Sequence, residues 1–189
     1  MSILHVHKLF LSSQQGWDEL ARTPPSALRL FLLLVLPFSL VPPLMLEYAG
    51  HHLGAALFPG APAQAWSTTA LVFLLAELAT VPLMAWAIRS VAHSKRIASD
   101  YRDAFTLAAI AAVPLWLSSL VLLSGEIVVI LAVLALGVAG SVALIFRGVE
   151  SVLKVEDSLV AFDVAYTVTA LGLVAWVVLV MLGLVPALA

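Results

Sequence analysis

The chain has 189 residues, of which 63% are hydrophobic and only 11% are charged. Soluble domains carry about 25% charged residues, so this chain has too few to cover a surface exposed to water. The net charge of -2 gives no reason to expect a nucleic-acid partner. The absence of cysteine excludes disulfides, iron–sulfur clusters and zinc sites with cysteine ligands. The composition therefore indicates a chain that lies mostly in lipid.

The apolar residues come in long unbroken runs and do not alternate with polar residues as they do in barrel strands. A helix needs about 20 mostly apolar residues to cross a membrane. Five stretches qualify: Leu30 to Ala49, Thr68 to Ile88, Ala104 to Leu123, Ile127 to Phe146, and Val164 to Val185. We therefore predict an all-α fold, a polytopic membrane helix bundle with about five transmembrane helices.

The basic residues predict the orientation of these helices. All nine lysines and arginines fall in the N-terminal segment, in the loop after the second span, or in the loop after the fourth. Five spans put those three segments on one side of the membrane. The positive-inside rule makes that side cytoplasmic, so we expect the N-terminus inside and the C-terminus outside.

The segment before the first span, residues 1–26, is predicted to be a cytoplasmic amphipathic segment at the membrane interface, followed by a five-helix transmembrane domain over residues 27–189. Apolar residues recur there at roughly helical spacing, and Phe10 and Trp17 are the expected interfacial anchors. Ser26 is expected to cap the first span, and Asp163 the fifth. The short run Ser124-Gly125-Glu126 predicts a tight hairpin between the third and fourth spans.

Glu77 is the charged residue expected near mid-bilayer, roughly ten residues into the second span. A carboxylate there costs about 2.5–3.5 kcal/mol on insertion scales, so Glu77 should face the bundle interior. One interpretation is a proton or cation site. The other is hydrogen bonding to a serine, threonine or tryptophan on a neighbouring helix, which we prefer because no other span offers a charge at that depth. The hydroxyl residues considered as partners are Thr80, Ser118, Ser119 and Ser141.

Prolines interrupt three of the predicted spans: Pro37, Pro42 and Pro43 in the first, Pro82 in the second, and Pro114 in the third. Each proline removes an amide donor and frees a backbone carbonyl. The freed backbone can form a hinge or bind an ion, or the proline can be a static kink that shapes packing. We prefer the kink, and we expect the Pro42-Pro43 pair to end regular helix early.

Glu47 and His51 lie four residues apart at the outer end of the first span, hence on one helix face. Together with His52 they make a weak candidate zinc site. Adjacent histidines rarely bind one ion together from a regular helix. We therefore expect neither a metal nor another cofactor.

The fourth span carries small residues at helical intervals, which let helices approach closely in lipid. They predict a helix-packing face within the bundle or between protomers, made of Ala135, Gly137, Ala139, Ser141 and Ala143, with Ala132 before them. No phosphate-binding loop, dinucleotide motif, metalloprotease motif or nucleophile elbow is present, so no enzyme activity is predicted.

Several local motifs follow one another in a familiar order. They are an amphipathic lead-in with Trp17, Leu36-Pro37 and Pro42-Pro43 in the first span, Tyr101 ahead of the third, Pro114 followed by Leu117 and Ser118, and the run Phe146 to Leu153 after the fourth. In these features the chain resembles the bacterial inner-membrane branch of the Yip family, the Ypt/Rab-interacting proteins. The resemblance covers most of the chain.

The resemblance implies a multi-pass protein of the bacterial inner membrane that acts as a non-enzymatic scaffold or adaptor. It supplies no catalytic residue. The implied partners are the lipid bilayer and other membrane proteins or further copies of the same chain. The alternative is a small transporter or channel that uses Glu77 as a proton or cation site in mid-membrane.

Overall fold

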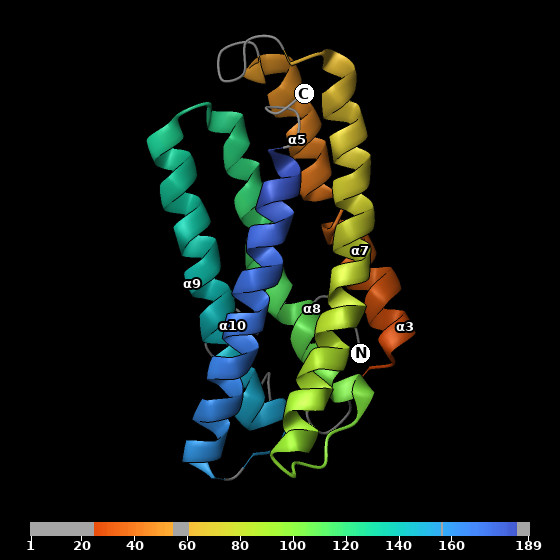
Figure 1. Ribbon diagram of the computed structural model, residues 1–189, viewed down its shortest axis with the longest axis vertical. Coiled ribbons are helices and arrows are strands. Elements are labelled where there is room, and N and C mark those ends of the chain that lie inside the picture. Colours follow the sequence, from red (N-terminus) through yellow and green to blue (C-terminus); the bar gives the residue numbers. More distant parts are fainter. Residues whose placement is uncertain (1–24, 55–60, 156, 185–189) are drawn as a thin grey trace.

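The computed structural model describes residues 25–54, 61–155 and 157–184, and all regular structure within these ranges is helical (Figure 1). The predicted all-α class is therefore confirmed. Phe10 and Trp17 lie outside the described residues. The elements in chain order are α3 (Ala27–Leu30), η2 (Phe31–Val35), α4 (Leu36–Phe38), α5 (Val41–His52), α7 (Ala63–Ser94), α8 (Tyr101–Ser118), η3 (Ser119–Ser124), α9 (Ile127–Val152) and α10 (Ser158–Gly183).

Five helical stretches within the described ranges are long and apolar enough to cross a membrane, as predicted. They run over Ala27–His52, Gln64–Ser94, Tyr101–Ser124, Ile127–Val152 and Ser158–Gly183. The chain is therefore a multi-pass membrane protein. The predicted hairpin between the third and fourth spans is also present, with Gly125 in the left-handed region at φ 69°.

The start of the fifth span differs from the prediction. Asp157, and not Asp163, is its cap: Oδ1 of Asp157 accepts hydrogen bonds from the amides of Leu159 at 2.9 Å and Val160 at 3.4 Å. Asp163 lies further along α10 and forms an ion pair with Lys95. The prediction failed because Asp163 precedes the unbroken apolar run, whereas the helix includes the mixed polar residues before it.

The helices alternate in direction, so their connections lie at two ends of the bundle (Figure 1). We call the basic end the one that holds the α7–α8 connection, with Lys95 and Arg96, and the α9–α10 connection, with Lys154. The end of α5, the start of α7 and the α8–α9 hairpin lie at the opposite end.

α8 is the central helix, because eleven of its residues are buried and it packs against both α7 and α9. α10 lies along α7 and α9 and closes the bundle on another side (Figure 1). The core is built mainly from alanine, valine, leucine and isoleucine side chains of α7, α8, α9 and α10.

The first span is not one regular helix. Its first part ends with a π-helical turn, η2, and the short helix α4, and the chain then turns at Ser39 and Leu40 before α5 begins. Pro42 and Pro43 lie in the first turn of α5, where their missing amide hydrogens leave no helical bond unmade. Regular helix therefore ends early in the first span, at Phe38, as expected, and the pair lies in the first turn of a new helix, α5.

Candidate functional site

Glu77 lies on α7 with only 5% of its surface exposed, and it faces the interior of the bundle. The indole of Trp116 on α8 forms a hydrogen bond with its carboxyl group. The ring of Trp116 also packs against Phe38 of α4, with ring centroids 6.4 Å apart and the planes tilted by 33°. Oε2 of Glu77 is buried and has no hydrogen-bond partner among the described residues. The site is thus a carboxyl group with one neutral donor beside it.

The four hydroxyl residues considered as partners of Glu77 form other bonds. Each donates to a backbone carbonyl: Thr80 to Ala76 at 2.7 Å, Ser118 to Leu115 at 2.7 Å, Ser119 to Trp116 at 2.6 Å and Ser141 to Ala111 at 2.6 Å. The first three bonds lie within the residue's own helical segment. Only the bond from Ser141 joins two separate spans, α9 and α8.

A cavity of about 320 Å³ lies beside Glu77. Its wall is formed by α7, α8, α9 and α10, with contributions from α5 and η3, and it is almost wholly apolar. Thr169 on α10 also lines it, and Oγ1 of this residue is buried without a hydrogen-bond partner in the described part of the chain. The cavity lining contains no charged residue besides Glu77 among the residues described.

The interior prolines lie at helix–helix contacts. The hydroxyl of Tyr101, at the start of α8, donates to the carbonyl of Pro82 on α7 at 3.5 Å. Pro114 of α8 packs against α9, where a Cβ atom added at Gly140 would lie 3.2 Å from its Cβ. Pro37 follows the π-helical turn in α4. That these prolines are static kinks stays a prediction. Pro82 and Pro114 each contact a neighbouring span.

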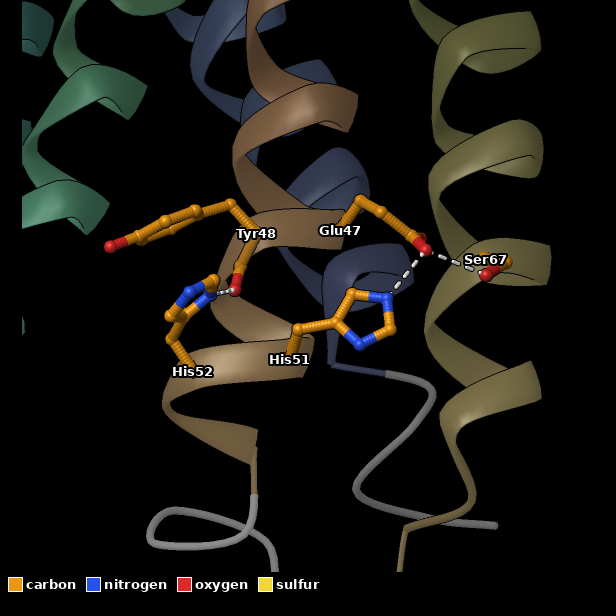
Figure 2. A network of polar contacts seen from close by, with 5 residues as sticks. All are labelled: Glu47, Tyr48, His51, His52 and Ser67. Carbon is orange, nitrogen blue, oxygen red and sulfur yellow. Dashed lines mark hydrogen bonds and ion pairs between the residues drawn. The ribbon is translucent and has the colours of Figure 1, made fainter.

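Glu47 and His51 form a polar network at the end opposite the basic end (Figure 2). Oε1 of Glu47 accepts a hydrogen bond from Nε2 of His51 at 3.1 Å and another from Ser67 of α7 at 2.8 Å. His52 points away from this pair: it bonds to the carbonyl of Tyr48 at 2.9 Å, and its ring stacks on that of Tyr48. The described residues include no group of three potential metal ligands. The network instead ties α5 to α7.

The small residues of α9 divide between two faces. Gly137 and Ser141 are buried against α8: a Cβ atom at Gly137 would lie 2.8 Å from Ser118 and 3.1 Å from the carbonyl of Pro114. In contrast, a row of alanines lies exposed on the outer side of the helix: Ala132, Ala135, Ala139 and Ala143. The prediction of a single packing face is therefore corrected, because the small residues form two faces of α9. One face packs against α8, and the other is exposed in the described chain.

Sequence reasoning did not single out Trp116, Thr169 or Ser67. Counting residues along the spans could have found Trp116. Glu77 and Trp116 lie at similar distances from the basic end of two adjacent antiparallel spans. Thr169 and Ser67 give no such signal, since each owes its position to the packing of a whole helix.

The five membrane-spanning helices and the order of the sequence motifs along them agree with one comparison. The family model described as the Yip1 domain matches residues 8–179. The chain belongs to the Yip family. Neither the comparison with curated proteins nor that with solved structures gives a match. The family match and the five apolar helices together identify a membrane protein that contacts lipid.

Proposed function

We propose that this Yip-family chain is a non-enzymatic scaffold or adaptor of the bacterial inner membrane, which organises partner proteins or copies of itself. Its N-terminus lies in the cytoplasm and its C-terminus outside, with residues 1–26 on the membrane surface. The family match supports the class of protein, and the segregation of all nine basic residues supports the orientation.

The observation that carries the proposal is the exposed alanine row of α9, which we call the α9 outer face: Ala132, Ala135, Ala139 and Ala143. In lipid, apolar surface alone does not drive helices together, so association depends on close packing. Small residues four apart allow another helix to approach the backbone of α9 closely. Since α8 already occupies the opposite face through Gly137 and Ser141, the outer face is free for a second protein.

The test is affinity purification in mild detergent, with the identity and stoichiometry of co-purifying proteins and the oligomeric state as readouts. Ala139→Leu should reduce self-association or the yield of a stoichiometric partner by about tenfold, because three added carbon atoms block the close approach of another helix. Ala170→Leu, on the exposed side of α10, is the matched control and should behave as the wild type. An unchanged assembly in Ala139→Leu would reject the α9 outer face as the interface.

A second candidate function is a small transporter or channel that uses Glu77 as a proton or cation site. It is favoured by one observation, the cavity beside a buried carboxyl group. A transporter usually holds a second ionisable group at similar depth, and the described cavity lining has none. Flux of protons or monovalent cations in proteoliposomes, lost in Glu77→Gln, would favour this alternative over the scaffold.

A further inference from the structure

The cavity beside Glu77 is long. Along α7 its wall extends from Phe73 to Ile88, and along α10 from Val168 to Leu184. At 1.5 Å per residue, the wall along α7 is about 22 Å long. The volume of about 320 Å³ falls at the lower end of the range for small-molecule sites, roughly 300–1,000 Å³. Such a shape suits one extended chain better than a compact ring system.

The cavity lies beneath one half of α10. The buried residues of this helix, Ala161, Val164, Ala165 and Val168, all belong to the half nearer the basic end. Beyond Val168 the helix has no buried residue. α10 therefore packs tightly at one end, whereas its other half lines the cavity until Gly183, where it again approaches Leu46 of α5 and Phe73 of α7. Protein interiors are normally close-packed, so this cavity is a specific feature of the fold.

Two buried polar atoms in the cavity wall lack hydrogen-bond partners in the described chain, Oε2 of Glu77 and Oγ1 of Thr169. The Thr169 side chain can rotate so that its hydroxyl donates to the carbonyl four residues before it, as helical threonines commonly do. Oε2 of Glu77 forms no such local bond in the described chain. Rotation about its last side-chain bond, which is a soft torsion, turns either oxygen toward the cavity. Glu77 is thus the group that lacks a partner and can reach one in the cavity.

Glu77 lies toward one end of the cavity. From its level the wall of α7 continues for eleven residues to Ile88, or about 16 Å. The remaining lining is apolar, and no lysine, arginine or histidine of the described chain lines it. An anionic head group would therefore meet a carboxyl group and no compensating cation. A neutral hydroxyl group can both donate to and accept from the Glu77 carboxyl, whatever its protonation state.

We propose that this cavity binds one single-chain, membrane-soluble alcohol, with its hydroxyl group hydrogen-bonded to Glu77 and its hydrocarbon chain extended between α7 and α10 toward Ile88. The inference goes beyond the scaffold function, because it assigns a ligand to the interior of the bundle and leaves the α9 outer face to protein partners.

The test uses the full-length purified protein in lipid nanodiscs and a dodecanol that carries a photoreactive diazirine in its chain. Cross-linked peptides are identified by mass spectrometry. Labelling should concentrate on cavity-lining residues of α7 and α10, and unlabelled dodecanol should displace the probe about fivefold better than dodecane, the ratio expected for one net hydrogen bond. Labelling spread evenly over lipid-facing residues, or equal displacement by dodecane, would overturn the proposal.

Two sets of variants localise the site. Gly172→Leu should reduce cavity labelling at least several-fold, because a Cβ atom there meets only Met84, at 3.9 Å, and the added side chain fills open space. Ala170→Leu places the same side chain on the exposed side of α10 and should label as the wild type. Should Gly172→Leu fail to purify as a single species, Ala175→Leu on the same wall replaces it.

The head-group contact is tested separately. Glu77→Leu should remove the preference for dodecanol over dodecane, whereas Glu77→Gln should keep most of it. Wild-type labelling in both the Gly172→Leu and Ala175→Leu variants, or an intact dodecanol preference in Glu77→Leu, rejects the site. These readouts are independent of partner capture through Ala139, so the ligand proposal can fail while the scaffold proposal stands.

Discussion

The hydroxyl of Ser141 on α9 donates a hydrogen bond of 2.6 Å to the backbone carbonyl of Ala111 on α8. Both residues lie in the turns that pack around Pro114, and the bond is buried. Among the described residues, the central helix α8 makes its most extensive contact with α9, and this side-chain bond links the two helices. Together with the close packing of Gly137, it therefore stabilises this register of α9 against α8.

Ser141→Ala should weaken the α8–α9 contact by about 0.6 kcal/mol, the average for an interhelical hydrogen bond measured in a membrane protein. The measurement is unfolding of the purified protein by denaturing detergent. Ser90→Ala is the matched control, because the Ser90 hydroxyl is exposed and bonds only to the carbonyl of Trp86 in its own helix. Equal effects of the two substitutions would show that the Ser141 bond does not stabilise the helix pair.

Gly137→Ala should destabilise the bundle by an amount on the order of 1–3 kcal/mol, the usual cost of overpacking. The new Cβ atom would lie 2.8 Å from Ser118 and 3.1 Å from the carbonyl of Pro114, so α8 and α9 must move apart. Gly172→Ala makes the same change where the nearest atom is 3.9 Å away, and its higher helix propensity should leave stability unchanged or raised. Thermal unfolding in detergent compares the two, and a stable Gly137→Ala would contradict the close approach.

Substitutions of Glu77 distinguish the scaffold proposal from the transporter alternative. Glu77→Gln keeps the size and most of the hydrogen bonding of the side chain, including an acceptor for Trp116. If Glu77 holds helices together, the Gln variant should assemble nearly normally, and Glu77→Leu should loosen the bundle by about 1 kcal/mol. Assembly in detergent and a growth or flux phenotype are measured on the same variants. Loss of function in Gln at wild-type stability would move the protein to the transporter class.

The orientation has its own test. A topology reporter fused after Ala189 should be active only outside the cytoplasm, whereas fusions after Lys95 and Lys154 should be active only inside. The physical reason is the cluster of basic residues in the two connections at the basic end, which resist transfer across the membrane. With five spans the termini must lie on opposite sides, so a C-terminal reporter active in the cytoplasm would contradict this topology.

The sequence predicted the number of spans and the hairpin because both depend on local properties, the length of apolar runs and a glycine between them. It could not tell which face of α9 points inward. In a soluble helix the apolar face marks the core, but lipid is as apolar as alanine, so Ala139 and Gly137 look alike by hydropathy. For the same reason the cavity was not foreseen: it depends on how α10 packs against its neighbours, which no local pattern encodes.

The interruption of the first span has a wider consequence. The turn at Ser39 and Leu40 divides the span into two helical parts that meet different neighbours. The elements α3, η2 and α4 contact α8, whereas α5 lies mainly against α7 and η3. In this way one span packs Phe38 against Trp116 and also lines the cavity with Leu46. The first span therefore joins the ring contact on the central helix to the wall of the cavity.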